Sequence, residues 1–237
     1  MKNGSMLPSL ILALGLALAG WFVGHGFLGA RTVERFVTVK GVSERDVQAD
    51  EAFWQIQFVS ADDDLGRAQD KIEKSKSEII AFLKRHGVDS SQTELQRLAV
   101  TDVLADPYRS ERAGSRFIIR QTLMVRSDNP KLIQAASQKV GELVDAGVVA
   151  EFGEGPTFLF TRLNDIKPQM IAEATANARK GAEQFALDSH SRLSGIRRAN
   201  QGVFEILPRD RVPGVFEGNQ LAKTVRVVAT VDYYLKN

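Results

Sequence analysis

The distribution of apolar residues divides the chain into two parts. From Leu7 to Ala30 the sequence is apolar almost without interruption, and Arg31 follows at once. The remaining sequence mixes apolar residues with frequent charges and has no second run of that kind. As a helix, the first run would measure roughly 36 Å, enough to cross a hydrocarbon core of about 30 Å. We therefore expect an N-terminal signal-anchor or transmembrane segment, residues 1–30, ahead of one soluble body, residues 31–237.

This apolar segment has two interpretations. The Ala-Leu-Ala sequence that ends at Ala19 fits the cleavage motif of a signal peptide, which would release the body into the periplasm. The sequence after Ala19 stays apolar, however, which favours a retained anchor with Leu7 and Leu28 near its ends. The positive charge of Lys2 favours a cytoplasmic N-terminus. We expect a single-pass inner-membrane protein with its body in the periplasm.

Strand and helix patterns follow one another along the body. Apolar residues alternate over 51–60 and 222–235, which predicts strands. Apolar positions three and four apart follow the acidic run 62–64 and predict an amphipathic helix that ends at Gly87. The same criteria predict strands over 36–41, 93–104, 116–127, 157–163 and 196–207, and helices over 130–146 and from Asn164 or Asp165 to about Ser191.

These elements make two strand–helix–strand–strand units, about 51–127 and 157–235. The two structural halves, about 36–127 and 157–235, are joined by the helix over 130–146. They share an order of elements rather than residue identity, which indicates a structural duplication. Strands joined by both hairpins and helical crossovers predict an α+β fold with mixed sheets and helices packed on one face.

The composition argues against several kinds of chemistry. The chain has no cysteine, so disulfides, thiol nucleophiles and zinc–thiolate sites are impossible. Its three histidines lack metal-ligand spacing, and no nucleophile-elbow or phosphate-loop motif is present. The acidic run 62–64 is typical of a helix cap rather than of a calcium loop. A net charge of +2 with interspersed signs does not favour nucleic-acid binding. The sequence therefore predicts no catalytic residue, cofactor or metal.

Two turn-rich loops, about 105–114 and 208–220, carry the candidate contact residues. Both are rich in arginine and acidic residues, for which a solvated loop is the ordinary interpretation. The second loop also holds apolar residues, which indicate contact with a neighbouring subunit or with the body itself. The candidate interface residues are Tyr108, Arg109, Val212, Val215 and Phe216, and the pair Gly20 and Gly24 is spaced for contact between membrane helices.

Small residues dominate the helix that is expected after residue 164. Six alanines fall between Ala172 and Ala186, on several faces of the helix. Such a helix can lie close to a sheet or to another helix. Packing in the core is the favoured interpretation, and a subunit interface is the alternative.

Two segments resemble the SIMPL-domain family of bacterial envelope proteins. The segments 37–41 (Val-Thr-Val-Lys-Gly) and 49–52 (Ala-Asp-Glu-Ala) are similar to the family's opening β-segment. The segment 178–186 is similar to its alanine-rich helix. The chain differs from the family at Ala49, where proline is usual, and at Ser194-Gly195, where a Leu-Gly pair is common. The resemblance covers most of the chain from about Phe36 to Tyr234.

The resemblance implies an exported or membrane-anchored protein with a duplicated α+β fold. Some relatives assemble into hollow oligomers, roles in envelope or oxidative stress have been suggested, and no catalytic residues are implied. We expect a non-enzymatic envelope protein, anchored in the membrane, that forms a homo-oligomer through its periplasmic domain and has a structural or stress-protective role. A periplasmic ligand- or peptide-binding module is the alternative, and a hydrolase with an unrecognised carboxylate pair is less favoured.

Overall fold

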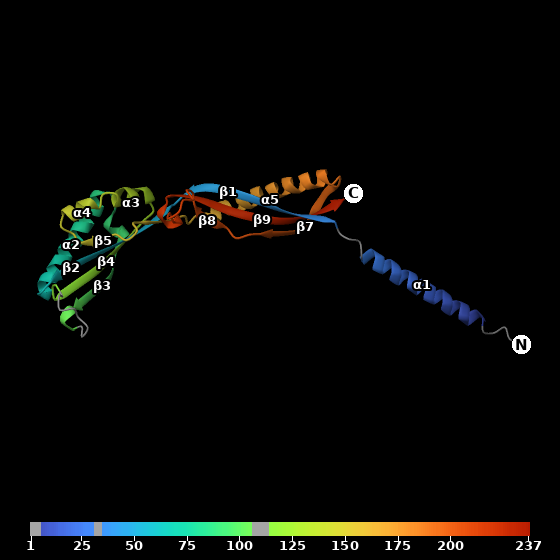
Figure 1. Cartoon of the computed structure of the whole chain (residues 1–237), viewed down its shortest axis with the longest axis horizontal. Helices are drawn as coiled ribbons and strands as arrows, with labels where there is room; N and C mark the ends of the chain where they lie inside the picture. Colours follow the sequence, from blue (N-terminus) through green and yellow to red (C-terminus); the bar gives the residue numbers. More distant parts are fainter. Residues whose placement is uncertain (1–5, 31–34, 106–113) are drawn as a thin grey trace.

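The chain folds into one isolated helix and two sheets that carry further helices (Figure 1). The computed structural model describes residues 6–30, 35–105 and 114–237. The α-helices are α1 (Met6–Ala30), α2 (Leu65–Arg85), α3 (Pro130–Ser137), α4 (Gly141–Asp145) and α5 (Leu163–Asp188). The strands are β1 (Phe36–Gln48), β2 (Glu51–Asp62), β3 (Thr93–Asp102), β4 (Phe117–Ser127), β5 (Ala150–Glu151), β6 (Thr157–Leu159), β7 (Arg192–Gln201), β8 (Glu205–Pro208) and β9 (Ala222–Lys236). Short 3-10 helices are η1 (Ser90–Gln92), η2 (Val103–Ala105) and η3 (Glu217–Asn219).

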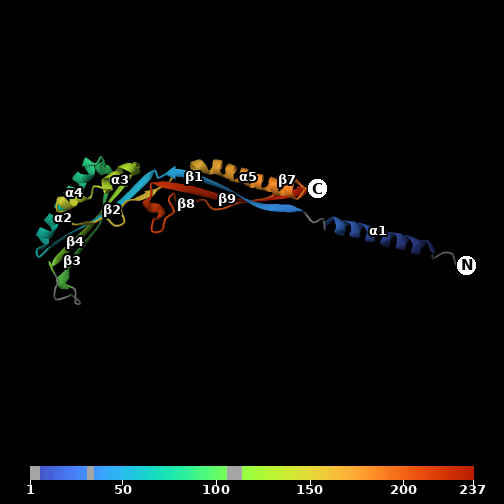
Figure 2. The same ribbon diagram turned by 45° about the horizontal axis from the view of Figure 1, so that its top comes forward.

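The two sheets form two lobes of an elongated molecule. The proximal lobe contains β1, β7, β8, β9 and α5, in the strand order β1-β9-β7 with β8 also paired to β9. The distal lobe contains β2 to β6 and α2 to α4, in the order β3-β4-β2-β5 with β6 also paired to β2. Figures 1 and 2 show that α1 leaves from the end of the proximal lobe that is farthest from the distal lobe. The α+β class is therefore as predicted.

The strand pairings correct two details of the prediction. Every recorded pairing in the two sheets is antiparallel, so the sheets are not mixed. In addition, β1 pairs with β9 along its whole length, so the strand that begins at Phe36 belongs with the C-terminal strands. The strand near Thr157 pairs with β2 instead of opening the second half. Periodicity shows which residues form a strand but not which distant strand is its partner.

The two lobes repeat one arrangement of strands, and one lobe is inserted in the other. In the distal lobe, β2, α2, β3 and β4 follow in the chain, and β4 lies between β2 and β3. In the proximal lobe, β1, α5, β7 and β9 follow in the chain, and β9 lies between β1 and β7. The whole distal lobe is placed between β1 and α5. The duplicated order is thus nested rather than consecutive.

The core of the distal lobe lies between its sheet and its helices. Trp54, Ile56 and Phe58 of β2 are fully buried against Ile72 and Phe82 of α2. Alternation along β2 and the three- and four-residue spacing along α2 place these residues on facing surfaces.

The structure can be compared with two predicted features of helices, the acidic cap at residues 62–64 and the single helix over 130–146. Asp64 caps α2 by accepting a hydrogen bond from the Arg67 amide at 2.9 Å, as the acidic run predicts. The single helix predicted over 130–146 is in fact two helices, α3 and α4. Glycine, which favours helices poorly, begins the second one at Gly141. Ala136 and Leu143 are buried on either side of the break, seven residues apart, so the apolar spacing gives no sign of it.

The proximal lobe has a thinner core that is built on small side chains. Met170 and every fourth residue after it, Ala174, Ala178, Ala182 and Ala186, form the buried face of α5. Valines of β9 pack beneath this face. These alanines therefore serve core packing, which confirms the favoured interpretation of the alanine-rich helix.

Residues 6–30 form the helix α1, which contains the apolar run of the sequence. Judged over the residues that the structure describes, no helix combines the length and the apolar character that a membrane crossing requires. The membrane span expected over residues 1–30 is therefore not supported by the structure. Gly20 and Gly24 lie in α1, and nothing lies within 4 Å of the position that a Cβ atom would take at either residue.

Candidate functional site

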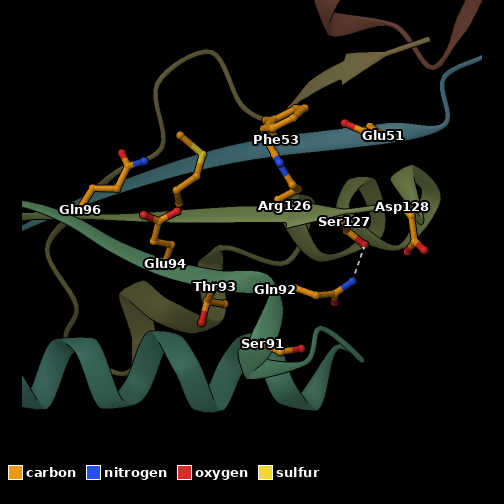
Figure 3. Close-up of a pocket in the computed structure, with 11 residues that line it drawn as sticks. Glu51, Phe53, Ser91, Gln92, Thr93, Glu94, Gln96, Arg126, Ser127 and Asp128 are labelled. Atoms are coloured by element: carbon orange, nitrogen blue, oxygen red, sulfur yellow. Dashed lines mark hydrogen bonds between the residues drawn. The ribbon is translucent and has the colours of Figure 1, made fainter. Parts of the chain in front are cut away.

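The distal sheet has one face covered by helices and one open face with a shallow depression. This depression, of about 540 Å³, lies over the strands β2, β3 and β4 (Figure 3). Near its centre the guanidinium of Arg126 stacks 4.6 Å from the centroid of the Phe53 ring. The lining residues are Glu51, Phe53, Ser91, Gln92, Thr93, Glu94, Gln96, Met124, Arg126, Ser127 and Asp128.

The charges around this depression favour a cationic group. Glu51, Glu94 and Asp128 contribute three carboxylates, whereas Arg126 is the basic residue of the lining. The Gln92 side-chain amide donates to the Ser127 hydroxyl at 3.2 Å and fixes one rim of the depression. Over the described residues, no group of histidines and carboxylates is arranged to hold a metal ion. The depression can therefore attract an amine, but it presents no recognisable catalytic group.

The strand β3 lies at the edge of the distal sheet and carries an exposed apolar row. Leu95, Leu98 and Val100 are 44%, 50% and 52% exposed. In the register they lie opposite Leu123, Gln121 and Ile119 of β4, all of which are buried beneath the helical layer. The helix α2 packs across β2 and β4, and the apolar row of β3 is therefore left uncovered by it. Edge strands with such rows pair readily with other strands.

A register break and a buried polar atom lie next to this row. The pairing of β3 with β4 shifts between Leu95 and Leu98. Beside Leu98, the Gln121 side-chain oxygen is buried and accepts no hydrogen bond from any residue that the structure describes. An unsatisfied buried acceptor destabilises the isolated fold. This part of the edge therefore combines an irregular pairing with an unsatisfied buried acceptor.

Asp50 joins the two lobes at the turn between β1 and β2. One carboxylate oxygen accepts the Thr161 amide at 2.8 Å, and the other accepts the Arg162 amide at 3.3 Å and its guanidinium at 3.0 Å. Arg162 is the N-cap residue of α5 and makes no side-chain cap of its own. The prediction that Asn164 or Asp165 caps this helix is therefore wrong. A carboxylate 111 residues earlier in the chain satisfies the backbone there instead.

An ion pair that involves a fully buried lysine lies near the junction, where η3 contacts β6. The side chain of Lys223 is fully buried and pairs with the Glu217 carboxylate, and it also donates to the Glu217 carbonyl at 2.7 Å. The same loop reaches the turn after β1, where the Ala49 amide donates to the Leu221 carbonyl at 2.8 Å. Sequence reasoning missed Asp50, Glu217 and Lys223 as structural residues, because their partners lie in other elements.

A model of the SIMPL family, described as "protein of unknown function (DUF541)", matches residues 37–232. The chain belongs to the SIMPL family. This confirms the resemblance of the opening β-segment and the alanine-rich helix. The match runs from β1 to β9, so the SIMPL domain includes both lobes. No curated protein matches the chain.

Two solved structures resemble the SIMPL protein only weakly. The regulatory subunit of aspartate kinase from Thermus flavus is 14% identical, with 82% of this chain and 89% of that chain covered, and has a TM-score of 0.21. An uncharacterized conserved protein from Listeria innocua is 12% identical, with 78% and 91% covered, and has a TM-score of 0.16. Scores this low do not indicate a shared fold or a shared function.

The predicted contact residues of the SIMPL protein differ in their exposure, and some lie outside the described residues. Tyr108 and Arg109 lie outside the described residues. Val212 and Phe216 are 54% and 64% exposed, and Val215 is half-buried. The 3-10 helix η3 of this loop contacts β6, at the junction of the two lobes. Contact of these loop residues with another subunit stays a prediction.

In the part of the chain that the structure describes, the carboxyl groups with clearly shifted pKa values shift downward. The Arg67 and Lys71 side chains lower the pKa of Asp62 strongly, and the Arg116 guanidinium lowers that of Asp102. Burial raises the pKa of Asp50, but the hydrogen bonds from Thr161 and Arg162 outweigh it and lower the value. The pKa values of Asp89, bonded to the Ser91 amide, and of Glu142, bonded to His86, are lowered as well. These are the shifts of capping and ion-paired carboxylates, whereas a general acid needs a raised pKa.

Proposed function

We propose that this SIMPL protein is a non-enzymatic envelope protein whose body self-associates through the edge strand β3. The observation that carries the proposal is the exposed row of Leu95, Leu98 and Val100 on an edge that continues the distal sheet. Its role is structural or stress-protective, because the sequence predicts no catalytic residue.

The physical argument concerns both the backbone and the side chains of this edge. Natural sheets protect long edge strands with charges, bulges or covering elements, because unpaired backbone groups recruit other strands. The strand β3 has a register shift but exposes about half of each apolar side chain in its row. A second copy that pairs antiparallel with β3 would form an isologous contact and cover both rows at once.

We also propose that the N-terminal segment anchors the protein in the inner membrane and leaves the body in the periplasm. The support is the sequence run from Leu7 to Leu28 and the charge of Lys2. Cleavage after Ala19, with release of the body into the periplasm, is the alternative. An anchored chain stays with membranes through salt and carbonate washes, whereas a soluble mature form that begins at Gly20 would exclude the anchor.

Light scattering of the detergent-purified full chain tests the self-association. We expect a discrete oligomer for the unmodified chain and a smaller particle for Leu98→Lys combined with Val100→Lys. The matched control is Val144→Lys combined with Val203→Lys, because these valines are 64% and 83% exposed and lie outside β3. A monomeric unmodified chain, or an oligomer unaffected by the β3 variant, would exclude this interface.

A ligand-binding module is the second candidate, and the depression around Phe53 and Arg126 favours it. Its surplus of carboxylates selects an organic cation, so spermidine is a suitable probe. Bound ligand should raise the melting temperature, since binding to the folded state stabilises it. Glu94→Gln should abolish that rise, and Glu154→Gln, an exposed change outside the lining, should not. No rise with the unmodified chain would leave self-association as the supported function.

A further inference from the structure

The end of the proximal lobe from which α1 departs is visible in Figures 1 and 2. Several residues of the strands that meet at this end are basic or apolar and exposed. The strand β1 begins here, β9 ends here and β7 begins here. The pairs Phe36 with Tyr234, and Arg192 with Lys236, place these strand ends side by side. We call the following set the collar: Arg35, Phe36, Arg192, Ile196, Arg197 and Lys236.

The collar combines positive charge with apolar surface. The Arg197 guanidinium lies 4.2 Å from the centroid of the Phe36 ring, which is itself 44% exposed. Ile196 is 47% exposed, and Arg35 and Lys236 are exposed as well. The last turn of α5, at the same end, adds Leu187, which is 68% exposed.

The acidic side chains at this end are fewer and partly engaged. Asp232 accepts a hydrogen bond from the Thr38 hydroxyl at 2.8 Å. Asp188, the last residue of α5, accepts one from the Gln184 side chain at 3.0 Å. Four of the six collar residues are basic, so the residues that the structure describes at this end carry more basic than acidic side chains around the apolar ones.

We propose that the collar docks on the anionic headgroups of the membrane surface. The inference rests on the proposed function, because α1 as an anchor holds this end of the SIMPL protein at the bilayer. Basic side chains gain electrostatic energy near anionic lipids, and aromatic side chains are favoured at the depth of the headgroups. A soluble partner would have to share this narrow end with the membrane, which favours lipid as its occupant. Docking would also hold the long axis at a fixed angle and keep β3 away from the membrane.

Hydrogen exchange on the full chain reconstituted in vesicles tests the collar. We compare vesicles of phosphatidylcholine with vesicles that contain roughly one-third phosphatidylglycerol. Residues 192–198 lie in the edge strand β7, so those of their amides that are not bonded to β9 report coverage. We expect about fivefold slower exchange there on the anionic vesicles, and a return to the neutral value in about 1 M salt, where the Debye length is about 3 Å.

Charge reversal identifies the residues responsible. Arg192→Glu combined with Lys236→Glu should remove the slower exchange. Lys131→Glu combined with Lys139→Glu is the matched control, because it makes the same change in net charge on exposed residues of the distal lobe. Equal exchange on both vesicle types, or equal effects of the two double variants, would overturn the collar proposal.

A carbonate wash separates the failure of the collar from the failure of the anchor. If the chain survives the wash but exchange is the same on both lipids, the collar proposal fails and the anchor stands. If the wash removes the chain, the anchor fails. The collar is then tested by flotation at low salt: binding to anionic vesicles alone supports it, and binding to neither vesicle overturns it.

Discussion

Gly41 of β1 lies directly against the backbone of Ala174 in α5. A Cβ atom on Gly41 would overlap the Ala174 carbonyl oxygen and the Ala178 amide nitrogen, and would lie 2.9 Å from the Ala178 Cα. Around this contact, the Asn177 side chain donates to the Val42 carbonyl at 2.9 Å. The small residues of α5 thus allow a helix backbone to rest on a strand backbone.

Gly41→Ala should therefore destabilise the SIMPL domain by about 3 kcal/mol, because the obstructing atoms are backbone and α5 must move. Gly181→Ala is the control: its new methyl group would lie 4.0 Å from Val39, and alanine favours a helix by about 1 kcal/mol over glycine. Urea unfolding of both variants measures the difference. Equal stability of the two variants would contradict the close contact.

Asp50→Ala should lower stability by about 2 kcal/mol near neutral pH, since a charged acceptor of several hydrogen bonds is lost. The folded-state pKa of Asp50 lies below its ordinary value of 3.8, so folding favours the charged form. That contribution is complete above the ordinary pKa and is lost as the pH falls through it toward the folded pKa.

Urea unfolding between neutral and acid pH measures this second effect. The loss of stability on acidification should be smaller in Asp50→Ala than in the unmodified chain. Asp145→Ala, which removes an exposed carboxylate of α4, is the matched control for the loss of a carboxylate. Parallel profiles for the Asp50 variant and the unmodified chain would mean that its carboxylate does not support folding.

The residues around these contacts show what a sequence can predict. Alternation over 51–60 and 222–235 gave strands close to the observed β2 and β9, because a half-buried strand shows its period locally. The pairing of Phe36 with Tyr234 was missed, since the two residues are distant in the chain and neither carries a sign of the other. The hydrogen bonds from Asp50 to the residues just before α5 were missed for the same reason.

The candidate site was less predictable than the fold. Leu95, Leu98 and Val100 look like ordinary strand residues, and only the position of α2 across β2 and β4 leaves them exposed. Loop residues such as Val212 and Phe216 were identified because apolar residues are unusual in turns. Local composition can therefore mark an exposed loop, whereas an exposed edge depends on how the sheet is covered.

Glu217→Ala should destabilise the lobe junction more than Lys223→Met. Removing the carboxylate leaves the fully buried Lys223 ammonium with only the Glu217 carbonyl, at a cost of about 3 kcal/mol or more. Lys223→Met replaces the buried cation with an apolar chain of similar length, and the Glu217 side chain, 32% exposed, can be hydrated instead. Thermal unfolding ranks the two variants, and a larger loss for Lys223→Met would contradict an energetically costly buried ammonium.

Tyr233→Phe should stabilise the proximal lobe by up to about 1 kcal/mol, because it removes a buried polar group without a partner. Tyr233 is fully buried beneath α5, and no described residue accepts or donates a hydrogen bond at its hydroxyl. The neighbouring Tyr234→Phe is the matched control, because Tyr234 is only half-buried and its change should stay within about 0.5 kcal/mol. Urea unfolding measures both variants. A clear loss of stability in Tyr233→Phe alone would instead indicate an ordered water bound to the hydroxyl beneath the helix, because such a water would satisfy the group that the variant removes.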